Sequence, residues 1–296
     1  MVLEIKDISK KFDKQVLNDV SIKLEPGIYG LLGPNGAGKS TLMKITATLL
    51  KADSGSIYLS GEDIKKQGEK YLDILGYLPQ DFGCYPGFTG YQMIEFLGRV
   101  KGMDQKTIQK RSEMLFREFD LYDARNKRVD KYSGGMKKRI GIIQAFINDP
   151  KILLLDEPTA GLDPIQRLHF KNYLTEQAKD KIILFSTHIT EDIESICQKI
   201  LLLKNGEIIV SGTEEEMISV LVNKIFEISI HQKNLKKFID KYKVVNYKAE
   251  RELMKVRFIN DEKIENSHYI KPTLEDVYLF YNDEGKKDGD INARLS

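Results

Sequence analysis

The sequence predicts an α/β protein built on a doubly wound, largely parallel sheet, because strand-like and helix-like segments alternate along most of the chain. Two apolar runs, Ile28–Leu32 and Ile152–Leu155, have the composition of strands buried on both faces of a sheet. A helix-like spacing of apolar residues follows each run, and a glycine-rich segment joins the first run to its helix.

The N-terminal region adds strands of a different kind. Residues 2–8 and 20–24 alternate apolar and polar side chains, which predicts half-exposed antiparallel strands and hence an N-terminal antiparallel β-subdomain. After the glycine-rich segment we expect a helix from Lys39 to about Leu50, then a short helix in the polar stretch between Gly61 and Gly76. A strand is expected at 74–78.

The middle of the chain predicts an inserted helical lobe over about residues 88–148, where apolar residues recur at helical spacing. Beyond it we expect a helix at 165–178, a strand at 181–185 and a helix from Thr190 to about Gln198. Asn205-Gly206 between two apolar runs predicts a β-hairpin.

Composition changes after about Thr213, so we expect residues 1–213 to form the main domain. Residues 214–281 then form a small C-terminal α+β extension, with short strands around a lysine-rich helix. The polar residues 282–296 are expected to be a disordered tail.

Overall composition excludes several classes of protein. The chain has 46 Lys and Arg against 44 Asp and Glu, a formal charge of +2, so no general positive field favours nucleic acid. Its apolar runs are too short to span a bilayer, its start lacks the layout of a secretory signal, and two cysteines are too few for a disulfide framework. We therefore expect a cytoplasmic protein with no nucleic-acid partner.

The segment from Gly33 to Thr41 fits the phosphate-loop pattern G-x-x-x-x-G-K-[ST], placed after a strand and opening a helix. Its glycines allow backbone N–H groups to face an anion, the lysine reaches the terminal phosphates, and the serine hydroxyl is suited to Mg²⁺. The residues expected to bind nucleotide here are Asn35, Gly36, Ala37, Gly38, Lys39, Ser40 and Thr41.

Two carboxylates, Asp156 and Glu157, end the second apolar run. Asp156 is placed to hold Mg²⁺, and Glu157 is then free to act as the general base that orients water. Taken alone, the pair could equally cap the next helix. Together with the phosphate loop, it predicts a P-loop NTPase core.

Between these motifs, Tyr132-Ser133-Gly134-Gly135-Met136-Lys137-Lys138-Arg139 resembles the S-G-G-Q signature of ATP-binding-cassette (ABC) ATPases. Gln80 resembles the Q-loop glutamine of that family, Ala160–Asp163 its D-loop and His188 its switch histidine. Phe12 stands where the family stacks an aromatic ring on adenine, although Tyr29 is a competing aromatic. The resemblance covers roughly residues 2–213.

The resemblance implies ATP and Mg²⁺ as cofactors and a homodimer in which two ATP molecules are sandwiched. Ser133, Gly134 and Gly135 would grip the γ-phosphate held by the other protomer, and Asp163 would link the two sites. His188 would steady the attacking water, and Gln80 would sense Mg²⁺ and water. Asp163 could instead be only a turn residue before Pro164.

Two residues depart from the signature, because Met136 replaces the usual Gln and Tyr132 the usual Leu. The Gly135-Met136 pair and the element Lys271–Tyr278 are similar to the branch that exports drugs, antibiotics or peptides. The resemblance thus implies the ATP-hydrolysing subunit of such an exporter, held at the inner face of the membrane by a separately encoded permease. An ABC importer ATPase and a soluble ABC ATPase are the alternatives.

The sequence also predicts two features of the surface. Phe82, Tyr85 and Phe88 lie in a Gly/Pro-rich loop, where they either cover the helical lobe or form a groove for a short helix of a membrane partner. Lys137–Arg139 is expected to be a solvated start of a helix.

Overall fold

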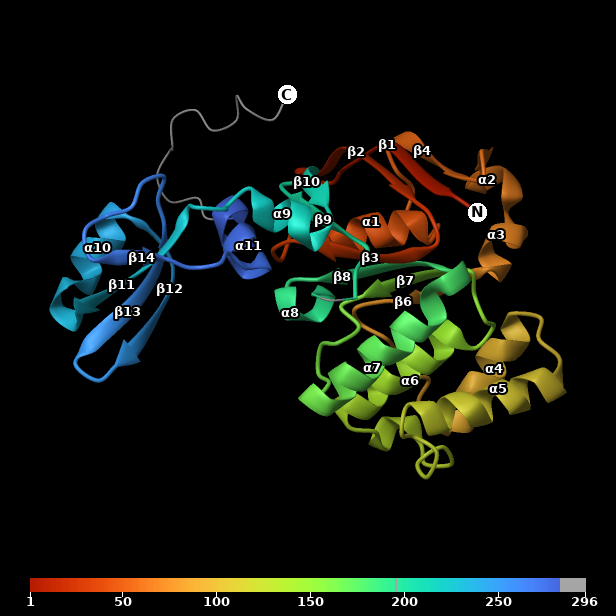
Figure 1. Ribbon diagram of the computed structural model, residues 1–296. Helices are drawn as coiled ribbons and strands as arrows, with labels where there is room; N and C mark the ends of the chain where they lie inside the picture. Colours follow the sequence, from red (N-terminus) through yellow and green to blue (C-terminus); the bar gives the residue numbers. More distant parts are fainter. Residues whose placement is uncertain (195, 283–296) are drawn as a thin grey trace. The chain divides into compact units, whose positions relative to one another are not determined.

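The computed structural model describes residues 1–194 and 196–282, and the chain divides into two compact units. The first unit is Met1–Thr213, and the second begins at Glu214. Figure 1 shows the path of the chain and the labels used below.

A six-stranded sheet forms the centre of the first unit, in the order β10-β9-β3-β8-β7-β6. Five strands run parallel, and β10 pairs antiparallel to β9 through the predicted Asn205-Gly206 hairpin. The strands are β3 (Gly27–Leu32), β6 (Leu75–Leu78), β7 (Ile152–Asp156), β8 (Ile182–Thr187), β9 (Lys199–Lys204) and β10 (Glu207–Gly212). This arrangement confirms the predicted α/β class with a parallel sheet.

A four-stranded antiparallel sheet of the first unit confirms the predicted N-terminal β-subdomain, in the order β2-β1-β4-β5. Its strands are β1 (Leu3–Lys11), β2 (Gln15–Leu24), β4 (Ser54–Leu59) and β5 (Glu62–Asp63). The sequence analysis missed β4, because its Ser-Gly-Ser start has little strand propensity. Antiparallel pairing with β1 holds this segment in the sheet instead.

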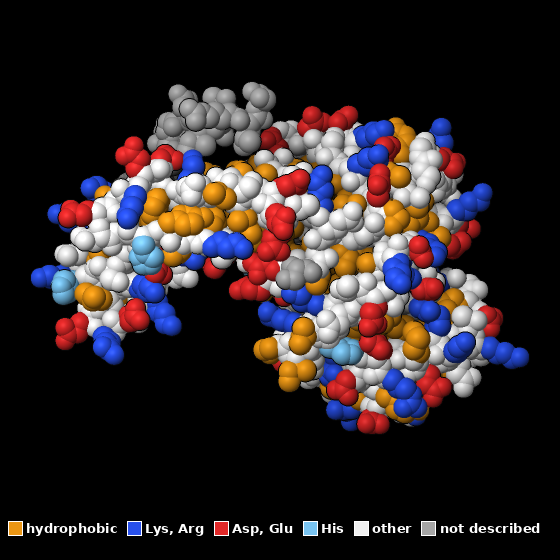
Figure 2. Space-filling view, in the orientation of Figure 1, with side chains coloured by type: hydrophobic (Ala, Val, Ile, Leu, Met, Phe, Trp, Pro, Cys, Tyr) orange, Lys and Arg blue, Asp and Glu red, His pale blue; other side chains and the backbone are white. Residues whose placement is uncertain are grey.

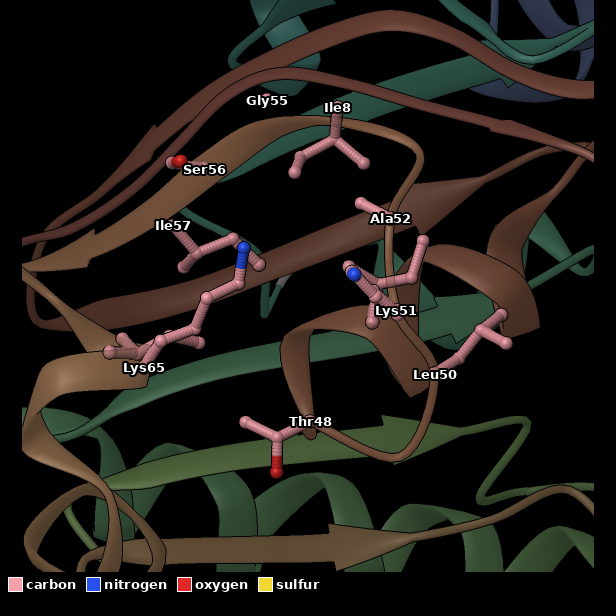
Figure 3. A pocket seen from close by; sticks show the side chains of 11 residues that line it. Ile8, Thr48, Leu50, Lys51, Ala52, Gly55, Ser56, Ile57 and Lys65 are labelled. Carbon is pink, nitrogen blue, oxygen red and sulfur yellow. The ribbon is translucent and has the colours of Figure 1, made fainter.

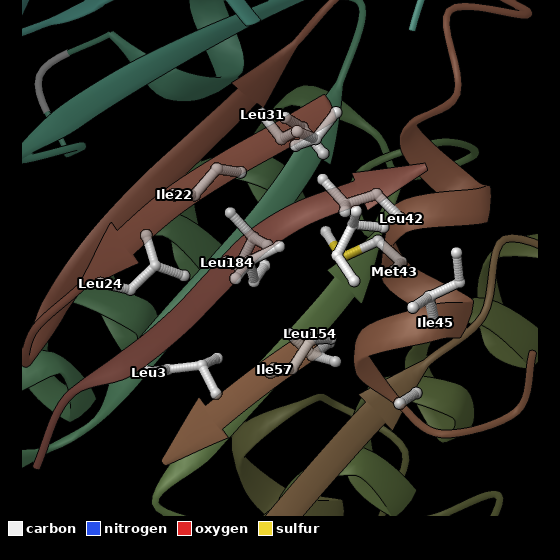
Figure 4. Close-up of a cluster of buried hydrophobic side chains, with 14 of the residues drawn as sticks. Leu3, Ile22, Leu24, Leu31, Leu42, Met43, Ile45, Ile57, Leu154 and Leu184 are labelled. Carbon is white, nitrogen blue, oxygen red and sulfur yellow. The ribbon is translucent and has the colours of Figure 1, made fainter. Parts of the chain in front are cut away.

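The main core of the first unit lies between these two sheets, with helix α1 (Lys39–Thr46) inside it. Figure 4 shows Leu42 and Met43 of α1 pointing toward Leu154 and Leu184 of the central sheet. All four side chains are fully buried. Because α1 is fixed by this packing, the phosphate loop that precedes it starts from a rigid element.

Helices cover the other face of the central sheet, and α6 and α7 lie directly on it in Figure 1. The long helices of this side are α4 (Gly90–Val100), α5 (Gln105–Glu118), α6 (Gly134–Phe146) and α7 (Pro164–Gln177). Shorter turns are α2 (Ile64–Gln67), α3 (Glu69–Asp73) and the 3₁₀ turns Val129–Lys131 and Ala178–Asp180. Three of the long helices fall within the segment expected to form a helical lobe.

Two predicted helices are too long. Helix α1 ends at Thr46, since Thr48 takes a left-handed backbone with φ of 61°. Helix α8 (Thr190–Ile193) ends where Glu194 turns extended, well before Gln198. The backbone N–H of Gln198 instead donates to Ile28 O at 2.8 Å, which ties this segment to β3.

The second unit is a four-stranded antiparallel sheet in the order β12-β13-β11-β14, with an apolar cluster that includes Leu235 and Phe238 of α10. Its elements are α9 (Glu214–Ser219), β11 (Ile225–His231), a 3₁₀ turn (Gln232–Asn234), α10 (Leu235–Lys241), β12 (Lys243–Glu250), β13 (Leu253–Ile259), β14 (Ser267–Tyr269) and α11 (Leu274–Asn282). Asn282 was expected in the tail but ends α11. The remaining residues of the predicted tail, 283–296, lie outside the described residues.

Helix α11 is held on the sheet by a buried ion pair. Asp276, which is 2% exposed, accepts two hydrogen bonds from the guanidinium of Arg257, one of them 2.7 Å long. The same carboxylate accepts from the backbone N–H of Thr273 at 2.7 Å and so caps the start of the helix. The element Lys271–Tyr278 therefore has a structural role inside this unit.

None of the helices in residues 1–194 and 196–282 is both long and apolar enough to cross a membrane.

Candidate active site

The residues expected to act on nucleotide lie after four neighbouring strands of the central sheet. The phosphate loop follows β3, His188 follows β8, Asp156 and Glu157 end β7, and Gln80 follows β6. The strands β3, β8, β7 and β6 are adjacent and parallel, so their carboxyl ends meet at one edge. In open α/β sheets this edge is where ligands bind.

The phosphate loop has the backbone that its glycines require. Gly36 and Gly38 have φ of 81° and 110°, a region that side-chain-bearing residues rarely adopt. A Cβ on Gly38 would also lie 2.7 Å from Val16 O, so no other residue fits there. Helix α1 begins at the next residue, and its free N–H groups point into the loop.

Lys39 is folded over its own loop. Its ammonium donates to Gly33 O at 2.6 Å and to Pro34 O at 3.1 Å, and the residue is 6% exposed. Burial lowers the pKa of Lys39, and the nearby carboxylates of Glu157 and Asp156 partly raise it again. The cation thus sits at the loop, where phosphate oxygens could replace the two carbonyls.

Asp156 has one satisfied and one unsatisfied oxygen. Ser186 Oγ donates to Asp156 Oδ1 at 2.5 Å, while Oδ2 is buried without a hydrogen-bond partner among the described residues. At the same edge, Ser40 Oγ donates to Gln80 Oε1 at 3.4 Å. Carboxylate, hydroxyl and amide oxygens are the ligands of a hard divalent cation, so these residues fit Mg²⁺.

Glu157 is held in a strained conformation by its neighbours. Its φ is 47°, and its backbone N–H is shared between Ser186 O at 3.2 Å and Ser186 Oγ at 3.1 Å. Its Oε1 lies 2.9 Å from Nδ1 of His188. Strain of this kind on a non-glycine residue is typical of functional sites. The carboxylate is thereby paired with an imidazole whose ring is 42% exposed.

Asp192 fixes the segments that carry Glu157 and His188, and the sequence analysis missed it. The carboxylate is 2% exposed and accepts from Thr159 Oγ1 at 2.6 Å and from Thr187 Oγ1 at 3.3 Å. Thr159 follows Glu157 by two residues, and Thr187 precedes His188. An acidic residue four positions after the histidine was the available signal. Ser186, which contacts both carboxylate residues, was also missed.

The start of α6 and the start of α7 form a second cluster. Ser133 caps α6 by accepting from the Met136 N–H at 3.3 Å, and a Cβ on Gly135 would lie 3.3 Å from Gly161 O. Gly134 is exposed, with open space at its Cα. Asp163 is the N-cap of α7 and accepts from the Gln166 N–H at 2.9 Å.

A hollow of about 460 Å³ lies between this cluster and Gln80, at the edge where the parallel strands end; we call this the catalytic edge, after the role expected of its residues. Its lining includes Gln80 and Asp81 after β6, Gly134 and Lys138 of α6, and Gly161 before α7. The hollow therefore brings the Q-loop, the signature helix and the D-loop together within one chain.

The aromatic candidates for adenine differ in exposure. Phe12 is 55% exposed, and the Lys10 ammonium lies 5.4 Å from its ring centre. Tyr29 is buried in the core, and its hydroxyl accepts from the Glu25 N–H. Of the two, only Phe12 offers a ring face to a ligand.

The expectation of a solvated helix start at Lys137–Arg139 was wrong. Lys138 is 9% exposed, and the Arg139 guanidinium donates to the carbonyls of Phe119 and Asp120. A run of cations in a sequence suggests exposure to water, but here Arg139 Nη1 donates to backbone carbonyls and Lys138 lies between two others. Tyr132 is also buried, and it donates to Ala124 O at 2.8 Å. Burial raises the pKa of Tyr132 to about 12.

The aromatic residues of the loop after Gln80 pack in two different places. Phe82 is half-buried against Gly141 of α6 and so packs on the helical lobe. Tyr85, Phe88 and Phe96 instead contact one another with ring centres 5.5 to 5.9 Å apart, and we call these three the aromatic cluster. Tyr85 is 49% exposed, so the cluster reaches the surface.

A separate cavity of about 160 Å³ lies in the antiparallel β-subdomain (Figure 3). Its walls are largely apolar, from Ile8, Ile57 and Ala52, with Lys51 and Lys65 beside it. The lining contains no residue of the phosphate loop and no carboxylate. This cavity is therefore distinct from the catalytic edge.

The geometry of the edge defines a class of protein. A phosphate loop on a parallel strand, a buried aspartate with a free oxygen and a glutamate paired with histidine are the parts of a P-loop nucleoside-triphosphate hydrolase.

Comparison with known proteins narrows the class. The ABC transporter family matches residues 17–160. The linearmycin resistance ATP-binding protein LnrL of Bacillus subtilis is 32% identical over 223 residues, which cover 74% of this chain and 72% of LnrL. The Nod factor export ATP-binding protein I of Burkholderia lata is 35% identical over 219 residues, covering 73% and 72%.

A solved structure of the ATP-binding subunit of an ABC transporter superposes with a TM-score of 0.69 at 30% identity, over 74% of this chain and 93% of that one. The chain belongs to the ABC transporter ATP-binding proteins, a family that binds and hydrolyses ATP.

Proposed function

We propose that this chain is the subunit that energises an exporter of a drug, antibiotic or peptide, by hydrolysing Mg-ATP and acting on a separately encoded membrane permease. The observation that carries the proposal is the meeting of the phosphate loop, Gln80, the Asp156–Glu157 pair and His188 at one sheet edge.

In this proposal the loop residues Asn35 to Thr41 hold the phosphates, and Lys39 exchanges its two carbonyl contacts for phosphate oxygens. Ser40, Asp156 and Gln80 hold Mg²⁺, which would neutralise charge on the transferred phosphoryl group. Phe12 stacks on the adenine.

Glu157 is the general base in the proposed reaction. Its position at the end of β7 is set by Ser186, so its carboxylate is fixed before water arrives. His188, 2.9 Å away, orients that carboxylate and the water that it activates.

We further propose that two copies close on two ATP molecules. Ser133, Gly134 and Gly135 would present the N-terminus of α6 to the partner's γ-phosphate, because Gly134 is exposed and unobstructed. Asp163 would lie at the same interface. Figure 2 shows hydrophobic side chains gathered over one end of α7, where Ile165 is 81% exposed and Leu168 is 60% exposed. Exposed apolar side chains beside Asp163 favour burial against a second copy.

The aromatic cluster is the proposed docking point for the permease, since it reaches the surface a few residues after Gln80. Held there, the subunit would lie at the inner face of the membrane, in the cytoplasm. Export is favoured over import by the names of LnrL and the Nod factor protein, and by the Gly135-Met136 pair. Residues 1–213 are the proposed ATP-binding domain, with its helical lobe at about 88–148, and 214–281 a separate extension.

The test of the ATPase assignment is Glu157→Gln. The amide keeps the size of the side chain, so ATP binding should stay within about twofold while kcat falls by about 10²- to 10⁴-fold. Hydrolysis at the wild-type rate would remove Glu157 from the mechanism. Affinity purification from membranes with wild-type and Tyr85→Ala chains then tests the permease, which should be recovered with the wild type and largely lost from the variant.

A further inference from the structure

Lys138 has surroundings that neither a nucleotide contact nor a surface role explains. The residue lies in the second turn of α6, five positions after Ser133, and is 9% exposed. Its Nζ is 3.5 Å from the carbonyl oxygen of Gln80 and 3.5 Å from that of Asp156. Both distances are at the long end for a hydrogen bond, so the ammonium sits between two carbonyls and not on either one.

Burying this cation is costly, and apolar side chains of similar volume often replace buried charges without loss of stability. Burial lowers the pKa of Lys138, and the carboxylates of Asp156, Glu157 and Asp81 raise it in part. Three carboxylates therefore lie near this lysine, although burial is the larger influence on its pKa. Stability alone does not account for a lysine in this place.

The two carbonyls belong to segments that must keep a fixed separation. Gln80 begins the loop after β6, and Asp156 ends β7, the next strand of the sheet. Backbone pairing of β6 with β7 stops at Leu78 and Leu155, one or two residues before these carbonyls. Beyond that point, the Lys138 side chain lies between the two segments, within 3.5 Å of a carbonyl of each.

The third element is α6 itself, which is capped by Ser133 and carries Lys138 in its second turn. We infer that Lys138 is a positioning residue, which links the signature end of α6 to the Q-loop and the carboxylate strand of the same chain. The inference rests on the proposed function, in which the start of α6 engages the ATP of a second copy. Engagement there would shift Lys138 and so adjust Gln80 and Asp156 at the chain's own site.

The inference predicts a specific pattern for Lys138→Met. The phosphate loop makes no described contact with Lys138, so affinity for nucleotide should stay within about twofold. Lys138 also lies against the Asp156 carbonyl, so its loss should speed exchange of the neighbouring Glu157 amide, which donates to Ser186 O, by about tenfold in the nucleotide-free protein. Misplacement of Gln80 should lower kcat by at least about tenfold with little change in KM.

Lys181→Met is the matched control. Lys181 is equally buried, at 7% exposed, but it pairs with Asp149 at the opposite end of β8 from His188. It reproduces the loss of a buried ammonium, and any general loss of stability, without touching the Q-loop. Lys138→Arg keeps a cation with several donors, and it should recover part of kcat relative to Lys138→Met.

Two measurements on the three variants test this role of Lys138. The first is hydrogen exchange without nucleotide, and the second is steady-state kinetics of ATP hydrolysis. Faster exchange of the Glu157 amide in Lys138→Met alone, with the kcat loss partly recovered by arginine, supports the inference. Unchanged exchange in Lys138→Met, or an equal loss of kcat in Lys181→Met, overturns it. A wild-type chain without ATPase activity would refute the proposed function, but it would leave the exchange comparison valid.

Discussion

Asp192→Ala is the substitution whose effect follows most directly from the structure. The change removes a buried carboxylate that accepts from Thr159 Oγ1 at 2.6 Å and from Thr187 Oγ1 at 3.3 Å. Hydrogen bonds to a charged acceptor contribute about 1.5–3 kcal/mol each when short, and the longer contact contributes less, so we expect a loss of about 3 kcal/mol. Arg167, whose side chain is 35% exposed and 4.0 Å away, adds little.

The loss can be converted into a melting temperature. An entropy of unfolding near 2.1 cal/mol/K per residue gives roughly 0.45 kcal/mol/K for a unit of this size, so the midpoint should fall by about 6–7 °C. Differential scanning calorimetry of the full chain measures this shift. ATP hydrolysis should fall as well, because Asp192 ties the segment after Glu157 to the segment before His188.

A double-mutant cycle with Thr159→Val isolates the shorter contact. The coupling energy between positions 159 and 192 should exceed about 1 kcal/mol, since the two groups are in direct contact. Asp192→Asn is the control, because an amide oxygen still accepts from Thr159 and should recover part of the loss. A midpoint within about 1 °C of wild type for Asp192→Ala, or additive effects in the cycle, would refute this reasoning.

Three further substitutions test other contacts. Gly90→Ala places a Cβ 2.2 Å from Tyr132 Oη and should lower the free energy of unfolding of the first unit by about 1–3 kcal/mol, measured by chemical denaturation. Adding Tyr132→Phe removes that oxygen and should recover part of the loss. No recovery would count against the clash. Asp276→Ala removes the carboxylate partner of Arg257, which keeps its bond to the Lys271 carbonyl, and should lower the stability of the second unit by about 2–3 kcal/mol. Limited proteolysis should then show earlier cleavage; an unchanged cleavage rate would contradict the role of the pair. Lys39→Met should raise the Kd for ATP at least about tenfold, as measured by titration calorimetry. A Kd equal to that of the wild type would show that the ammonium does not reach phosphate.

The sequence indicated which segments meet at this edge of the sheet, because each segment has a local pattern. Gly33–Thr41 and the Asp156–Glu157 pair each follow a strand whose apolar run is visible in the sequence, and parallel pairing then brings the strand ends together. The hairpin at Asn205-Gly206 was equally local. Such features need only a short window of residues and one rule of topology.

The residues that were missed depend on contacts between distant segments. Asp192 and Lys138 look like exposed helix residues in the sequence, and only tertiary packing buries them against partners 33 and 58 residues away. Strand β4 has a weak local signal and forms because β1 offers an edge to pair with. Helix α8 ends early since the following segment bonds to β3 instead. A pattern within a short stretch of sequence does not show which distant residues these segments will contact.

The central claim is that ATP joins two copies of this chain through the Ser133 end of α6. Analytical ultracentrifugation of Glu157→Gln with and without Mg-ATP tests it most directly, because this variant binds ATP without consuming it. The proposed mechanism predicts that the mass doubles only with Mg-ATP and that a second change, Ser133→Arg, returns it to that of one chain. A Glu157→Gln variant that remains monomeric at saturating ATP, or that dimerises equally well without ATP, would contradict the claim.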